Sequence, residues 1–89
     1  MFKRILVPFD FSEAATHALQ EATRLAAEQG VGLTILHVYH PPEVAEWLNP
    51  ELVRKVRKNQ LDNLERRLSE QAALVLPEQM PRELLLSSG

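Results

Sequence analysis

The sequence contains no cysteine among its 89 residues, which excludes disulfide bonds, thiolate catalysis and cysteine metal ligands. No apolar run approaches the ~20 residues needed to cross a bilayer, and the N-terminus has no signal-peptide pattern. Cationic charge is not in excess, since the formal net charge is -2, which argues against partners bound through bulk basicity. We therefore expect a cytoplasmic protein that binds neither nucleic acid nor membrane.

The first half of the chain alternates between strand and helix patterns. Residues 2–8 form a short apolar run that Pro8 ends, because proline cannot donate to a β-ladder. From Ser12 to Gln29, apolar residues recur on one helical face, and Gly30 supplies a stop. Residues 32–39 are rich in β-branched and aromatic side chains, which predicts a second strand.

A longer helix and a third strand are predicted after residue 48. Asn49 is a good N-cap and Pro50 a good first helical residue, and the apolar spacing continues to about Leu76. Residues 82–87 read as the start of a strand, whereas the short apolar stretch at residues 44–48 has no clear form.

The second helix is too long for the strands that it should cover. About 27 residues would span ~40 Å at 1.5 Å per residue. Either the helix breaks, or its overhang packs on something else. We expect Trp47, Leu48, the overhang and the leucine stripe of this helix to lie in the core or at a contact with a partner chain.

Strands that alternate with helices indicate an α/β fold with a parallel sheet. With strand order 3-2-1 and right-handed crossovers, both helices fall on one face of the sheet. Residues 5–7 and 84–86 are nevertheless continuous apolar runs, as expected where both faces are covered. We infer that the chain is the N-terminal portion of a longer domain, or that a partner subunit supplies the second layer.

Asp10 is the first candidate functional residue, because ligands of open α/β sheets bind beyond the carboxyl ends of the strands. A purely structural interpretation competes with this one. Asp10 and Glu13 form a capping-box-like pattern, in which the aspartate would only accept helix N–H groups, and Ser12 is a second candidate N-cap.

Residues 3–13 (KRILVPFDFSE), then Ala18 and Leu19, then residues 33–38 (LTILHV) resemble the universal stress protein family. The resemblance implies a Rossmann-like, adenine-nucleotide α-hydrolase-like parallel sheet of order 3-2-1-4-5. Residues 1–89 would hold its first three strands and two helices, as the N-terminal part of a single domain whose C-terminal half is absent.

Many members of that family bind ATP, and the resemblance implies nucleotide-binding positions at Pro8, Phe9, Asp10 and Val38. The aspartate would lie near the ribose, and the backbone at Val38 would meet the adenine. The family's phosphate-binding motif, G-x2-G-x9-G-[ST], is missing, because none of the three glycines has that spacing. Phe9 replaces a residue that is often small or polar in nucleotide binders, so it either stacks on a base or crowds the site.

Other polar residues favour no further chemistry. His37 and His40 straddle a strand end without a third ligand, so no metal site is predicted. No histidine belongs to a nucleophile, base and acid arrangement, and His17 lies among surface positions, so no enzyme is predicted. The basic residues of the second helix read as a solvated face rather than a phosphate groove. They are Arg54, Lys55, Arg57, Lys58, Arg66 and Arg67.

Two functions are consistent with these residues and with the resemblance. The first is a regulatory protein of the stress response whose complete domain binds ATP. The second is a dimeric interaction protein that binds no nucleotide and in which Asp10 only caps a helix. Both hypotheses include a homodimer.

Overall fold

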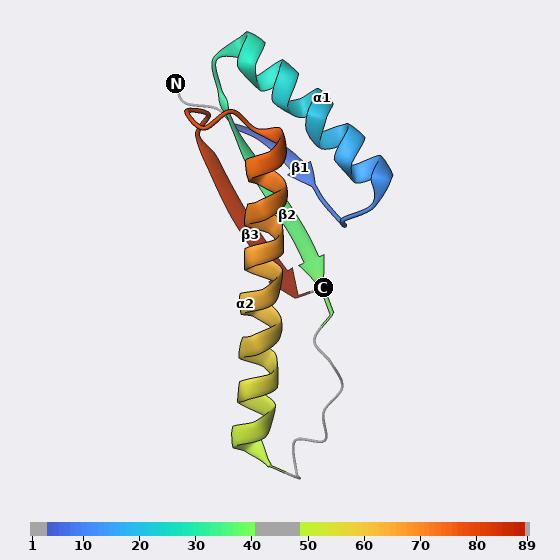
Figure 1. Ribbon diagram of the computed structural model, residues 1–89, viewed down its shortest axis with the longest axis vertical. Coiled ribbons are helices and arrows are strands. Elements are labelled where there is room, and N and C mark those ends of the chain that lie inside the picture. The colour runs from blue at the N-terminus through green and yellow to red at the C-terminus, as the bar shows by residue number, and fades with distance from the viewer. Residues whose placement is uncertain (1–3, 41–48, 89) are drawn as a thin grey trace.

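The computed structural model describes residues 4–40 and 49–88, which form three strands and two helices (Figure 1). Each element lies within one or two residues of its predicted bounds, apart from the first strand, whose predicted residues 2 and 3 lie outside the described ranges. In chain order they are β1 (Arg4–Pro8), α1 (Glu13–Gln29), β2 (Gly32–Tyr39), α2 (Pro50–Val75) and β3 (Arg82–Ser88).

The sheet is parallel and has the order β1-β2-β3, so β2 is its central strand. Ile5 pairs with Leu33 at the start of the first ladder, and that ladder ends where Pro8 pairs with Leu36. The second ladder runs further, to the pair Tyr39 and Ser88. The predicted α/β class and strand order are confirmed, and β2 extends past the end of β1 on one side.

Local signals explain where the helices begin and end. Ser12 caps α1, and Gly30 ends it in the left-handed conformation at φ 67°, which glycine adopts without steric cost. Asn49 caps α2 by accepting hydrogen bonds from the N–H groups of Glu51 and Leu52.

The helix α2 does not break. Its 26 residues correspond to ~39 Å, and Figure 1 shows its N-terminal part extending past the sheet. Of the two alternatives for this helix, an overhang is therefore the correct one. Trp47 and Leu48, expected in the core or at a partner contact, lie outside the described residues, as does the whole stretch 44–48, for which no clear form was predicted.

One hydrophobic core holds both helices against the same face of the sheet. Its largest fully buried side chains are Leu19 of α1, Leu33 and Ile35 of β2, and Leu68 of α2. Because residues 33 and 35 of the central strand point to the side that carries both helices, the predicted one-sided arrangement is confirmed.

The other face of the sheet is not covered within the described part of the chain. Leu6 of β1, Val38 of β2 and Leu85 of β3 alternate with inward-facing residues and are 59%, 49% and 41% exposed. At one end of this face, Arg4 Nη1 lies 3.1 Å from Glu83 Oε2, so an ion pair reaches across the central strand. We call this surface the open face.

Leu68→Ala tests the role of the α2 core position. Leu68 is 1% exposed, so its truncation should lower the free energy of unfolding by about 2–5 kcal/mol. Leu74→Ala on the same helix is the control, because Leu74 is 79% exposed and its truncation should change stability by less than about 0.5 kcal/mol. Urea denaturation followed by circular dichroism measures both, and equal losses would contradict the assigned core.

Candidate functional site

A hollow of about 360 Å³ lies beyond the carboxyl ends of β1 and β2, where α1 begins. All four sequence-predicted site residues contribute to it, from two strands and the turn that follows β1. Its lining consists of Pro8, Phe9, Asp10, Ser12, Ala14, Ala15, Leu36 and Val38. The structure therefore brings the predicted residues together in one place.

The turn from β1 to α1 presents Asp10 to this hollow. The Ser12 N–H donates to Asp10 Oδ1 at 3.0 Å, and the Ala15 N–H donates to Ser12 Oγ at 3.0 Å. Ser12, and not Asp10, is thus the N-cap of α1, so the capping box of Asp10 and Glu13 is not formed. Asp10 stabilises the cap residue instead of the helix N–H groups.

Asp10 is an exposed, ionised carboxylate. Hydrogen bonds from the Ser12 side chain and then from its backbone N–H lower the pKa of Asp10 below the ordinary value of 3.8. A carboxylate offers about four lone-pair sites, and the hydrogen bonds from Ser12 use only part of them. The carboxylate therefore retains acceptor capacity for a hydroxyl group in the hollow.

The Phe9 side chain belongs to the hydrophobic core. The side chain is 3% exposed and lies edge-on to Phe11, with ring centroids 5.1 Å apart. Because the ring is buried in the core, it does not offer a face on which a base could stack. The interpretation that Phe9 stacks on a base is wrong, and the alternation of side chains along the chain after β1 explains why its ring faces the core.

Val38 faces the hollow with backbone groups that β1 does not reach. Leu36 O accepts a hydrogen bond from the Phe9 N–H at 2.8 Å, whereas the Leu33 N–H donates to Pro81 O beside β3. Alternate residues of a strand direct their backbone groups to opposite neighbours, so Val38, like Leu36, faces the β1 side. The β1 ladder ends at Leu36, which leaves the Val38 N–H and C=O directed at the space beyond it.

Sequence reasoning missed part of this site. Leu36 carried a signal, since it lies two residues before Val38 and therefore on the same face of the strand. Ala14 and Ala15 follow the N-cap, where small side chains leave room beside the turn. Phe11 shapes the turn beside the hollow without lining it. Its positive φ of 63° is uncommon for a residue other than glycine, so the sequence carries no signal for this conformation.

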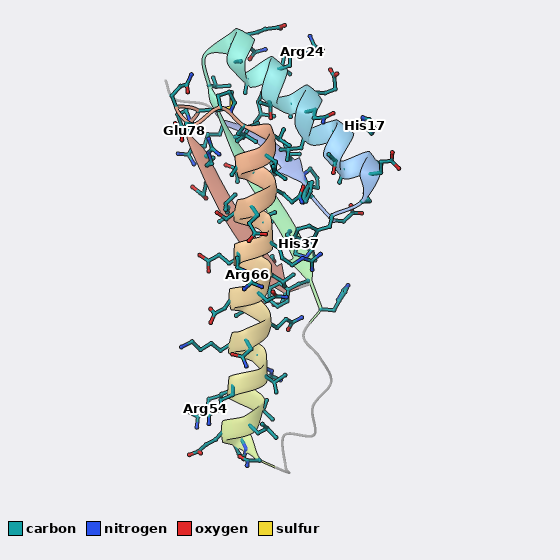
Figure 2. The ribbon with its side chains drawn as sticks, in the orientation of Figure 1. His17, Arg24, His37, Arg54, Arg66 and Glu78 are labelled. Carbon is teal, nitrogen blue, oxygen red and sulfur yellow. The ribbon has the colours of Figure 1, made fainter. Side chains whose placement is uncertain are left out.

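Metal ligands and a membrane span are two further features to consider in residues 4–40 and 49–88. No group of three histidine or acidic side chains there could hold a metal ion. His17 lies on α1, away from His37 near the end of β2 (Figure 2). No helix of the described segments is long and apolar enough to span a membrane.

The comparisons with known proteins bear on the family and the fold of the chain. The profile of the universal stress protein family matches residues 1–84. The chain belongs to the universal stress protein family. Comparison with curated protein sequences gives no match.

Two solved structures share the fold. A universal stress protein, UspA, from Lactobacillus plantarum has a TM-score of 0.58 and 24% identity, covering 98% of this chain and 62% of that one. A universal stress family protein from Burkholderia pseudomallei has a TM-score of 0.53 and 22% identity, covering 99% and 64%. The chain thus spans less than two thirds of either structure, and its place as the N-terminal part of a larger domain stays a prediction.

Ser12→Ala tests the turn that holds Asp10. The variant should lose about 0.5–2 kcal/mol of stability through the missing cap, and the pKa of Asp10 should rise toward 3.8. Because the folded pKa of Asp10 is the lower one, its stabilising contribution is present above pH 3.8 and is lost as the pH falls through the folded value. The loss of stability on acidification should therefore be smaller in Ser12→Ala.

Carboxyl-carbon NMR titration measures the pKa of Asp10, and denaturation at several pH values measures the stability. Ser69→Ala is the control, because Ser69 is exposed on α2 and should change neither quantity. An unaltered Asp10 titration in Ser12→Ala would show that the serine does not set the pKa.

Proposed function

We propose that this protein serves in the stress response by binding the nucleoside part of an adenine nucleotide, ATP in the first place, without catalysing a reaction. One observation carries the proposal: an ionised carboxylate and a stretch of strand backbone beyond the end of the β1 ladder meet at the same hollow. Asp10 would accept from ribose hydroxyls, and the Val38 N–H and C=O would pair with the adenine edge.

The chemistry of the hollow favours a nucleoside over a small anion. Its wall of Pro8, Leu36 and Val38 is apolar, which suits the faces of a base and sugar. The carboxylate of Asp10 would repel a phosphate placed beside it. Phosphates would have to lie away from Asp10, and the three glycines of the chain lack the spacing that cradles them.

Calorimetric titration of the chain with adenosine, AMP and ATP tests this function. We expect measurable adenosine binding that the phosphates strengthen little. Asp10→Ala should weaken adenosine binding by about tenfold or more, because a hydrogen bond to a charged group contributes ~1.5–3 kcal/mol.

Glu13→Ala is the matched control for this titration. Glu13 is an exposed acid in the first turn of α1, close to Asp10 in sequence, but it does not line the hollow. Its removal should leave the affinity within about twofold of the unmodified chain. Equal affinities for Asp10→Ala and the unmodified chain would remove Asp10 from the site.

A second candidate function is self-association through the open face, as expected of a dimeric interaction protein. A two-fold axis parallel to β2 would lay β1 of one copy over β3 of the other. It would bring Arg4 to the same end of the sheet as Glu83 of the second copy, so the charges would be complementary across the contact. The apolar residues Leu6, Val38 and Leu85 would lose their exposure to water.

Leu85→Lys should then weaken the dimer, because it places a charge in the middle of the contact. Sedimentation velocity over a range of concentrations measures the dissociation constant, which should rise by about tenfold or more. Leu74→Lys, on the exposed side of α2, is the control and should leave it unchanged. A monomer at every concentration would contradict the homodimer.

A further inference from the structure

The β1–β2 ladder ends earlier than its geometry requires. In a parallel pair the hydrogen bonds are evenly spaced, so the bond from the Phe9 N–H to Leu36 O should be followed by one from the Val38 N–H to Phe9 O. That bond is not formed between these two described residues. Phe9 O lies 2.7 Å from His37 Nδ1, and the carbonyl can only accept, so Nδ1 carries the proton.

His37 reaches Phe9 O from the helix-covered side of the sheet. It follows Leu33 and Ile35 on the inward-facing positions of β2 and does not line the hollow. A carbonyl oxygen has two lone pairs, but in this structure the donor that Phe9 O holds is the His37 imidazole and not the Val38 N–H. The Val38 N–H, on the β1 side of β2, does not donate to that carbonyl.

Neighbouring side chains hold the imidazole in this position. The Phe11 ring lies edge-on to it, with centroids 4.9 Å apart and an interplanar angle of 71°. The guanidinium carbon of Arg67 lies 4.3 Å from the centre of that same Phe11 ring. The α2 helix thus supports His37 through Phe11, and Figure 2 labels His37 near the end of β2.

We propose that His37 is a positioning residue of the nucleoside site: by occupying Phe9 O it stops the β1–β2 ladder and keeps the Val38 N–H available for the base. This inference rests on the proposed nucleoside function. It predicts two opposite effects of removing the imidazole: the sheet should gain a backbone hydrogen bond, and the affinity for the nucleoside should fall.

His37→Leu in the whole chain tests this role. With Phe9 O released, the Val38 N–H should donate to it, and hydrogen exchange of the Val38 amide should slow by at least about threefold. Adenosine affinity should fall by about threefold to tenfold, the range for one neutral hydrogen bond. A histidine with a purely structural role would give the opposite exchange result, because its loss would loosen the strand end.

Two variants serve as controls. His37→Asn places an amide donor near the position of Nδ1. Its adenosine affinity and its Val38 amide exchange should therefore match those of the unmodified chain. His17→Leu makes the same chemical change on the exposed surface of α1 and should alter neither quantity. If His37→Leu does not fold, His37→Val carries the same comparison with a β-branched residue.

The two readouts separate this inference from the function on which it rests. Unchanged or faster Val38 exchange in His37→Leu would overturn the positioning role, whatever the affinity. Slower exchange in a chain that binds no adenosine would support the effect of His37 on the ladder and refute the nucleoside site. Slower exchange with unaltered adenosine affinity would overturn the claim that the Val38 N–H meets the base.

Discussion

The central position of β2 is the constraint on which the other features depend. Right-handed crossovers on either side of a shared central strand place α1 and α2 on one face, where Leu33 and Ile35 are fully buried. The same geometry leaves the opposite face open and lets β2 extend beyond β1. The hollow at Asp10 and the exposed row of Leu6, Val38 and Leu85 are therefore two consequences of one arrangement.

The sequence predicts the features that depend on local chemistry. The bounds of β2 follow from its β-branched run, and the start of α2 follows from Asn49 and Pro50, because caps and propensities act over a few residues. The strand order is implied by the family resemblance, and the handedness of the crossovers then places both helices on one face. The clustering of Pro8, Asp10 and Val38 follows in turn from strand order and from the resemblance to the universal stress proteins.

Features that depend on contacts between distant residues could not be predicted in this way. The bond from His37 to Phe9 spans 28 positions, and Arg67 of α2 meets Phe11 of the first turn. Gly32 is a third case, since a Cβ there would lie 2.5 Å from Pro81 O, which only the approach of β3 explains. In the sequence, a glycine at the start of a strand indicates only where the strand begins. In the structure, Gly32 permits the close approach of two backbones.

The conformation of the β1–α1 turn is held from the side opposite the hollow. Phe11 adopts φ 63°, a conformation that costs an ordinary residue about 1–3 kcal/mol. Edge contacts with Phe9 and His37 and the Arg67 cation over the ring each contribute roughly 0.5–1 kcal/mol, enough together to offset that cost. All these contacts lie beneath the turn. Asp10, between Phe9 and Phe11, is consequently fixed while its carboxylate remains open to a ligand, the requirement for a preorganised binding residue.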